Sequence, residues 1–88
     1  MKHEIKAQER NFNWIRSGRK TFEITRANKE YRPGDEILFR EWSDIMNSYT
    51  GRTEERIISY IYAGGGQYGL APGYIILALL KKPEAGKC

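Results

Sequence analysis

A lysine and a glutamate three positions apart, Lys20 and Glu23, are the two side chains in this sequence best suited to chemistry. A carboxylate accepts hydrogen bonds from the exocyclic amines of a nucleobase, and an ammonium group binds a phosphate or carbonyl oxygen. The same two residues would otherwise form a surface ion pair, which contributes about 0–1 kcal/mol to stability. The spacing therefore indicates either a nucleotide site or a solvated ion pair.

Basic residues concentrate around this pair. The segment from Arg16 to Arg32 holds six Lys or Arg and two Glu, and this surplus of four equals the net charge of +4 of the whole chain. Clustered cations of this kind neutralise phosphates, so Arg19 and Arg26 are predicted phosphate contacts. The alternative is that these cations only complement a helix C-terminus and flank a strand.

Two aromatic residues, Tyr68 and Trp42, are candidate stacking groups for a base. Tyr68 lies in a stretch with four glycines between Gly64 and Gly69, where bare backbone N–H groups could approach a phosphate. The same glycines also suit a long turn that needs positive φ. Trp42 ends a predicted strand, where an aromatic residue serves either as a stacking platform or as a plug at the rim of the core.

Hydrophobic periodicity indicates one helix and about five strands. Residues 8–17 follow a helical pattern that ends at Gly18, a residue typical of helix C-caps. Pro33 and Gly34 occupy the central positions of a predicted type II turn. Residues 43–53 are polar and are expected to form a hairpin loop. Strands are predicted at residues 2–7, 21–26, 36–42, 56–63 and 74–80.

Alternation along the strands assigns side chains to faces. Phe22 and Ile24 are expected to point to the core, which directs Glu23 to the opposite face. Tyr60 is expected to share the packed face of Ile58. The candidate site thus lies on the outward side of the strand that follows the helix.

The predicted fold class is α+β and mainly β, in a single domain over residues 1–82 followed by a flexible tail at 83–88. An open sheet of five strands with one helix would leave one face and two edges bare. The sheet is therefore expected to curl into a small barrel capped by the helix.

The composition excludes several kinds of site. Cys88 is the single cysteine and His3 the single histidine, so an intrachain disulfide and an ordinary zinc site are not expected. His3 is expected at the surface or at a strand edge. Residues 1–6 lack the apolar stretch of a signal peptide, and the longest apolar run, at 74–80, is seven residues. We therefore expect a cytoplasmic protein with no metal, no cofactor and no membrane partner.

The order of these motifs resembles an ASCH domain of the PUA-like superfamily. The helix is followed by S-G-R-K-T-F-E-I at 17–24, P-G-D-E-I-L at 33–38, R-E-W at 40–42 and G-G-G-Q-Y-G-L at 64–70. More narrowly, residues 3–80 are similar to DUF3850, a family of small bacterial and phage proteins of unknown function. The resemblance implies a five- to six-stranded β-barrel with the N-terminal helix packed at its side and an RNA-associated cleft beside that helix.

In ASCH domains a G-x-K-x-x-E-x-R motif lines the cleft, and Gly18, Lys20 and Glu23 match it. At the position where the motif has its arginine this sequence has Thr25, and Arg26 follows one place later. One place along a strand means the opposite face, unless a bulge at Thr25 restores the orientation.

The resemblance and the charge pattern predict a domain that binds RNA or a modified nucleotide through Lys20 and Glu23. Some small ASCH proteins hydrolyse N4-acetylcytidine with a motif similar to Gly18-Arg19-Lys20-Thr21. The enzymatic alternative is therefore a nucleoside amidohydrolase whose catalytic residues are Lys20, Thr21 and Glu23. The remaining alternative is a protein-interaction module of phage origin, which would present an exposed apolar patch in place of a basic groove.

Overall fold

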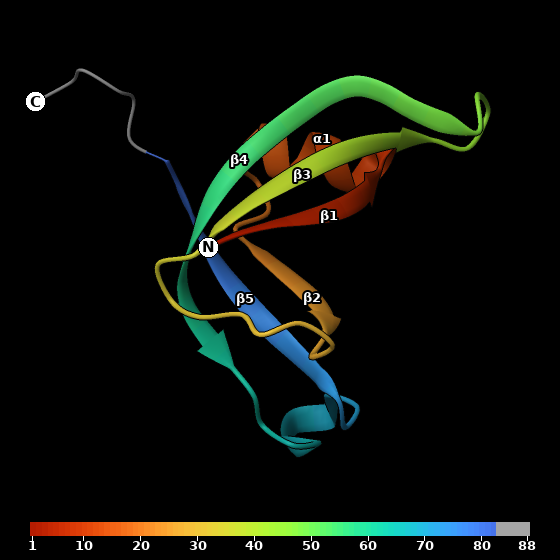
Figure 1. The fold of residues 1–88 in the computed structure, drawn as a ribbon. Helices are drawn as coiled ribbons and strands as arrows, with labels where there is room; N and C mark the ends of the chain where they lie inside the picture. The colour runs from red at the N-terminus through yellow and green to blue at the C-terminus, as the bar shows by residue number, and fades with distance from the viewer. Residues whose placement is uncertain (83–88) are drawn as a thin grey trace, which may run out of the picture.

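The computed structural model describes residues 1–82, and the tail expected at 83–88 lies outside the described residues. Within this part the chain forms five strands, one α-helix and one short 3₁₀ turn (Figure 1). In chain order the elements are β1 (Lys2–Gln8), α1 (Glu9–Arg16), β2 (Phe22–Arg26), β3 (Glu36–Ser43), β4 (Ser48–Tyr62), η1 (Gln67–Gly69) and β5 (Tyr74–Lys81).

The helix α1 is short and buries one side. Phe12 and Ile15 are both 0% exposed and face the core. The helix ends as predicted, because the N–H of Gly18 donates to the carbonyl of Ile15 (3.1 Å) and Gly18 adopts a φ of +83°. A β-carbon would be strained in that left-handed conformation. No helix within residues 1–82 has the length and apolar character needed to cross a membrane.

The five strands form one mixed sheet in the order β1-β3-β4-β5-β2. β1 runs parallel to β3, and the other neighbouring strands are antiparallel. The helix packs against β1, β3 and β4. Between the helix and the sheet lies a core of nine apolar residues, namely Ala7, Phe12, Ile15, Ile37, Phe39, Ile58, Ile75, Leu77 and Leu79.

The sheet is open, so the prediction of a closed barrel is wrong. The edge strands β1 and β2 do not pair, and the segment between β2 and β3 returns from the end of β2 to the start of β3 beside the N-terminus (Figure 1). In that segment Lys29 Nζ donates to the carbonyl of Glu4 in β1 (3.0 Å). The Tyr31 ring lies 4.6 Å from the His3 ring. Both contacts are to the edge strand β1, and a loop laid over an edge is one of the ways proteins protect it without strand pairing.

His3 lies on the edge strand β1, as one of the two predicted alternatives has it, but it is buried and not at the surface. It is 7% exposed, and its Nε2 lies 2.8 Å from Asp35 Oδ2. The carboxylate and the Tyr31 ring account for this position, because a buried imidazole needs a hydrogen-bond partner.

β4 departs from the predicted pattern at two places. It begins at Ser48, so that the hairpin loop expected at 43–53 is confined to residues 44–47. A shift of register between Ile58 and Tyr60 marks a bulge in the pairing with β5. The bulge turns Tyr60 to the face opposite Ile58, where it is 64% exposed, so the prediction that Tyr60 packs with Ile58 is wrong.

Candidate functional site

The turn between α1 and β2 holds the predicted pair close to the helix. The N–H of Lys20 donates to the carbonyl of Trp14 (3.0 Å), and the N–H of Leu79 donates to the carbonyl of Thr21 (2.8 Å). The first bond fixes the turn to the last part of α1, and the second fixes it to β5. The backbone that carries Lys20 is therefore anchored on both sides.

The side chains of Lys20 and Glu23 converge on one polar group of α1. Lys20 Nζ lies 3.3 Å from Glu23 Oε1. The Asn11 amide bonds to both, because its Nδ2 donates to the same glutamate oxygen (3.3 Å) and its Oδ1 accepts from Lys20 Nζ (2.5 Å). We call Asn11, Lys20 and Glu23 the polar cluster. The side chains of Lys20 and Glu23 are only 21% and 12% exposed.

Asn11 was not among the residues predicted from the sequence. Its position could be inferred from the helical spacing. Asn11 and the buried Ile15 are four positions apart, so they lie on the same side of the helix. A polar residue on the flank of an apolar stripe needs a partner, and here the partners come from the turn and from β2.

β2 is oriented opposite to the prediction. Glu23 is 9% exposed, whereas Phe22 and Ile24 are 43% and 48% exposed. The polar cluster explains the reversal, since a carboxylate can be buried when it is paired and hydrogen-bonded. The prediction that Phe22 and Ile24 point to the core is wrong.

Tyr31 lies at the inner side of the polar cluster. Burial raises the pKa of Tyr31 above its ordinary value, a hydrogen bond with Thr25 acts in the other direction, and the negative charge of Glu23 adds to the rise. The phenol is therefore neutral at physiological pH and keeps its proton for hydrogen bonding.

A hollow of about 430 Å³ opens beside the turn and is lined by Trp14, Arg19, Lys20 and Phe22. Lys20 Nζ lies 5.4 Å from the centre of the Phe22 ring. Arg19 is exposed, and no carboxylate within residues 1–82 forms an ion pair with it. The hollow thus combines two aromatic side chains with two cations.

The structure places Arg26 away from this hollow. The pairing of β2 with β5 is regular, without a bulge at Thr25. Arg26 therefore lies on the outer face with Ile24, opposite Glu23. Its Nε donates to the Tyr74 hydroxyl (3.2 Å). Of the predicted site residues, Lys20 lies with Arg19 at the hollow and with Glu23 in the polar cluster, and Arg26 lies at neither.

Trp42 and Tyr68 also lie outside the polar cluster and the hollow. The Trp42 ring meets Tyr49 edge to face at 5.1 Å, with Lys6 Nζ 4.5 Å from its centre. Tyr68 is 92% exposed in η1, with a positive φ of 55°, and its ring lies 6.2 Å from that of Tyr62. These aromatic residues belong to other parts of the sheet and its connections.

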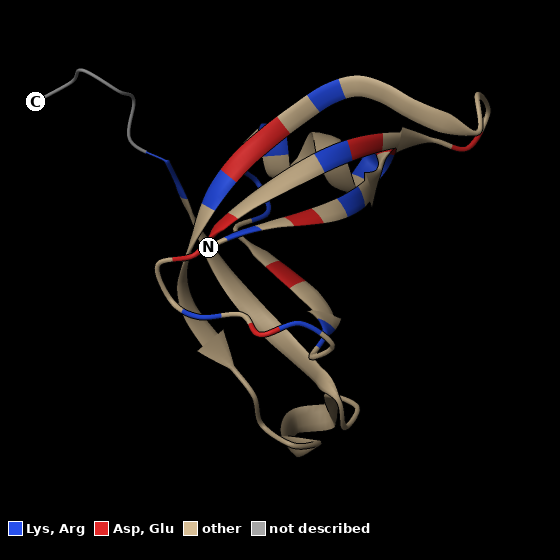
Figure 2. Ribbon diagram, viewed as in Figure 1, with Lys and Arg blue, Asp and Glu red and all other residues tan. Residues whose placement is uncertain are grey.

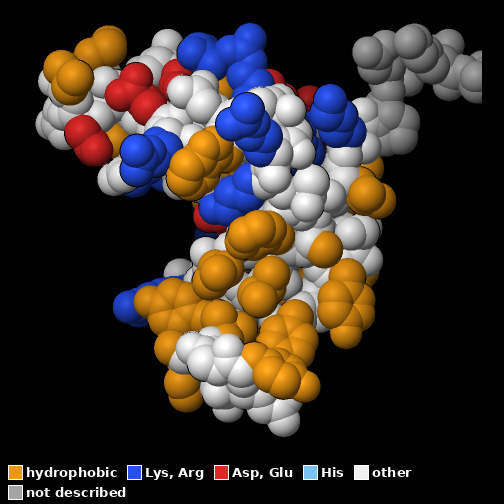
Figure 3. Space-filling view, turned by 180° about the vertical axis from the view of Figure 1, so that it is seen from behind, with side chains coloured by type: hydrophobic (Ala, Val, Ile, Leu, Met, Phe, Trp, Pro, Cys, Tyr) orange, Lys and Arg blue, Asp and Glu red, His pale blue; other side chains and the backbone are white. Residues whose placement is uncertain are grey.

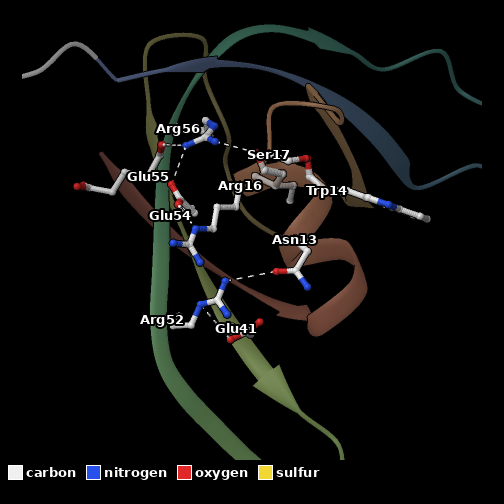
Figure 4. A network of polar contacts seen from close by, with 10 residues as sticks. Asn13, Trp14, Arg16, Ser17, Glu41, Arg52, Glu54, Glu55 and Arg56 are labelled. Atoms are coloured by element: carbon white, nitrogen blue, oxygen red, sulfur yellow. Dashed lines mark hydrogen bonds and ion pairs between the residues drawn. The ribbon is translucent and has the colours of Figure 1, made fainter.

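On its other side α1 is held by arginines and glutamates of β3 and β4 (Figure 4). Arg16 Nε lies 3.6 Å from Glu54 Oε1, and Arg52 Nε lies 3.6 Å from Glu41 Oε1. The buried Arg56 donates to the carbonyl of Ile15 (2.8 Å). Each of these cations has a carboxylate partner within the network. The network therefore joins the helix to the sheet, and it offers less unpaired charge than the hollow.

The charges divide the molecule into two parts (Figure 2). Residues 57–80 contain no Asp, Glu, Lys or Arg. In the view from behind, hydrophobic side chains gather over the lower half and Lys and Arg over the upper half (Figure 3). The exposed apolar residues on the outer face of β2, β4 and β5 are Phe22, Ile24, Tyr60 and Leu80. We call these four residues the outer apolar face.

Within residues 1–82, no group of three or more His, Cys, Asp or Glu side chains is placed to hold a metal ion. The polar cluster contains one carboxylate, one amide and one ammonium group. Its chemistry is that of hydrogen bonding and ion pairing with an organic ligand or a phosphate.

Comparison with known proteins identifies the family. Residues 2–79 match the model of DUF3850, a domain of unknown function. The chain belongs to this family. The match extends from β1 to β5 and includes the polar cluster and the residues that line the hollow.

The DUF3850 chain is also similar to a phage protein. It is 30% identical over 57 residues to the uncharacterized 12.9 kDa protein in the GpA 3′ region of Escherichia phage P2. The aligned part is 65% of this chain and 50% of the phage protein. The chain thus spans about half the length of this relative.

Proposed function

We propose that this chain binds RNA or a modified nucleotide in the hollow beside α1, with the polar cluster as the group that recognises the base. The observation that carries the proposal is the convergence of Lys20 and Glu23, whose Nζ and Oε1 atoms lie 3.3 Å apart, together with the position of Lys20 in the lining of the hollow. Asn11 holds both charges in place.

The hydrogen-bond donors and acceptors that the polar cluster leaves unused support this assignment. Both hydrogen bonds to Glu23 use Oε1, and within residues 1–82 no donor is bonded to Oε2. That oxygen can accept a hydrogen bond from an exocyclic amine. Lys20 carries three donors, of which Asn11 and Glu23 use two. One carboxylate oxygen and one ammonium proton therefore remain for a ligand.

The resemblance to ASCH domains supports the same site. Gly18, Lys20 and Glu23 match the G-x-K-x-x-E-x-R motif of ASCH domains. The arginine of that motif has no equivalent beside the polar cluster, because Arg26 lies on the opposite face. Arg19 lines the hollow and is free to bind a phosphate in its place.

Binding has more support than hydrolysis. An amidohydrolase that used Thr21 would need a base beside its hydroxyl. Within residues 1–82 the Thr21 hydroxyl has no hydrogen bond to Lys20 or Glu23. The polar cluster accordingly fits recognition of a ligand better than activation of a nucleophile.

The outer apolar face favours a second candidate function, a protein-interaction module. Its four side chains are between 43% and 64% exposed, and Arg26 of β2 and Glu55 of β4 are the charged residues on the same face of these strands. A partner for this face would itself be apolar and uncharged. Binding of such a protein would survive Lys20→Ala, whereas binding of RNA would not.

The primary proposal is tested by titrating a fluorescently labelled single-stranded RNA with the wild type and with Lys20→Ala. We expect Lys20→Ala to weaken binding and to make it less dependent on salt, because one phosphate or base contact is lost. Lys2→Ala is the matched control. Lys2 is exposed on β1, so this substitution removes the same charge at a place outside the hollow. Equal affinities for the three proteins would contradict the proposal.

A further inference from the structure

Trp14 and Phe22 flank the hollow from two different elements, α1 and β2, and neither is used to close the core. They are 46% and 43% exposed. Figure 4 shows the Trp14 side chain extending away from the arginine–glutamate network that joins α1 to β4. The indole is thus not needed for packing on that side. It forms one wall of the hollow, with Phe22 at another.

The short connection between these two aromatic residues fixes their relative position. The carbonyl of Trp14 accepts from Ser17 Oγ (3.1 Å) and from the N–H of Lys20 (3.0 Å). Phe22 is the first residue of β2 and pairs with Ala78 of β5. Side chains on backbone that is already held in place lose less conformational freedom when a ligand binds.

The charges at the hollow are unequal. Lys20 shares its charge with Glu23, whereas Arg19 has no ion-pair partner within the described chain. A ligand that fits such a place has flat apolar faces, polar edges and a negative group at one end. A nucleobase with its phosphate has these properties, and bases stack on aromatic side chains in single-stranded nucleic-acid complexes.

We propose that one unpaired nucleobase stacks on Trp14 and Phe22, with its phosphate at Arg19 and its polar edge at Lys20. This inference rests on the proposed function and narrows the ligand to single-stranded RNA or a free nucleotide, because a base inside a duplex has both faces covered. The volume of about 430 Å³ lies within the roughly 300–1,000 Å³ that is typical of small-ligand sites.

The neighbouring surface limits how much of a strand the protein contacts. Beside Phe22, the outer face continues onto β5 and the second half of β4, and residues 57–80 carry no charge. Residues 57–80 therefore offer a phosphate no cation, and Arg26 of β2 is the cation that shares the outer face with Phe22. For one or two phosphates we expect a shallow salt dependence, with a slope of log K against log salt of about −0.7 to −1.4.

The test compares a labelled single-stranded RNA hexamer with the matching hexamer that lacks all bases. Fluorescence anisotropy gives the affinity of each for the wild type, for Trp14→Leu and for Phe22→Leu. Tyr60→Leu is the matched control, because Tyr60 is an exposed aromatic residue of the outer face that does not line the hollow. An RNA duplex of the same sequence completes the set.

We expect Trp14→Leu and Phe22→Leu each to weaken binding of the intact hexamer about tenfold, the range of one lost base–aromatic stack. Tyr60→Leu is expected to bind like the wild type. The hexamer without bases and the duplex are expected to bind the wild type more weakly than the intact single strand. The comparison of the two hexamers uses the wild type alone, so it holds even where a variant folds poorly.

Two different results separate this inference from the function on which it rests. If Lys20→Ala weakens binding but the wild type binds both hexamers equally, base stacking is overturned and the RNA site stands. If the wild type binds neither hexamer and no nucleotide, both are overturned. Tighter binding of the duplex than of the single strand would also overturn the stacking of an unpaired base.

Discussion

Asn11 of α1 donates a hydrogen bond from Nδ2 to Oε1 of Glu23 in β2 at 3.3 Å, and this bond ties the helix to the edge strand of the sheet. The two residues are twelve positions apart. Lys20 lies between them in the chain and bonds to both. The charge pair at the hollow is thus positioned by a neutral side chain, and its geometry depends on how α1 packs.

Asn11→Ala tests this relationship. It removes two hydrogen bonds from the partly buried polar cluster, each of which contributes about 0.5–1.5 kcal/mol to stability. We expect the free energy of unfolding, measured by urea denaturation, to fall by about 1–2 kcal/mol. The affinity for single-stranded RNA should fall as well, because Lys20 and Glu23 lose their common anchor.

Asn13→Ala is the control for Asn11→Ala. Asn13 lies on the same helix, but it is exposed and accepts from Arg52 on the opposite side (3.3 Å). We expect a smaller loss of stability and no change in RNA affinity. Equal effects of the two substitutions on RNA binding would contradict the role given to Asn11.

The orientation of β2 predicts unequal costs for two apolar substitutions. Leu77 of β5 is 0% exposed, and Leu77→Ala should cost about 2–5 kcal/mol because it leaves a cavity in the core. Ile24 is 48% exposed on the outer face, and Ile24→Thr should cost less than about 1 kcal/mol. Urea denaturation of both variants measures the difference. A large loss of stability in Ile24→Thr would contradict this orientation, because it would indicate that Ile24 packs in the core and that Glu23 faces the solvent.

Local features of the fold could be predicted because they depend on neighbouring residues. The end of α1 follows from Gly18. The turn before β3 follows from Pro33 and Gly34, where the N–H of Asp35 donates to the carbonyl of Arg32 (3.0 Å) and Gly34 has a φ of +94°. Such conformational requirements depend on a few consecutive residues, so they can be predicted from a short stretch of sequence.

The faces of β2 and β4 depended on residues far along the chain. The alternation of β2 is compatible with burial of either face, and the choice is made by Asn11, which only the packing of α1 brings to Glu23. The bulge before Tyr60 depends on the pairing with β5. Closure into a barrel is expected because bare edges are unfavourable, whereas in the structure Lys29 and Tyr31 contact the edge strand β1 from a loop. The pair Lys20 and Glu23 was predicted, while its position on the inner side was not.

The carboxylate of Asp35 predicts a loss of stability in acid. The hydrogen bond from His3 is the first cause that lowers the pKa of Asp35 below its ordinary value, and the amino group of Met1 and the N–H of Arg32 act in the same direction. The unfolded chain therefore takes up this proton at a higher pH than the folded chain. The stabilisation is complete above the ordinary carboxyl pKa of about 4 and is lost as the pH falls through the lowered folded-state pKa.

Asp35→Asn isolates this contribution. Thermal unfolding of the variant and of the wild type should differ most near neutral pH, and the difference in Tm should shrink below about pH 4. Glu36 also has a lowered pKa, through its hydrogen bond with Lys82, so the wild type alone would mix two carboxylates. A difference in Tm that stays constant from pH 7 to pH 2 would show that Asp35 does not contribute through its charge.

The buried Arg56 gives the last prediction. It is 7% exposed, and its guanidinium donates to the carbonyls of Ile15 (2.8 Å) and Glu55 (2.7 Å). The Ile15 carbonyl belongs to the last turn of α1, where carbonyls lack the usual helical N–H partner. It accepts from the N–H of Gly18 and from Arg56. Arg56→Met keeps much of the side-chain volume and leaves these acceptors and the Glu54 carboxylate without their charged donor.

We expect Arg56→Met to lower the free energy of unfolding by about 1–3 kcal/mol, the cost of leaving buried polar groups unsatisfied. Arg16→Met is the matched control, because the Arg16 side chain is 55% exposed and its partner Glu54 keeps its contact with Arg56. Urea denaturation of the two variants gives the comparison. If Arg16→Met were the more destabilising of the two, the attachment of α1 to β4 would depend on the exposed ion pair of Arg16 with Glu54 in Figure 4 and not on the buried guanidinium.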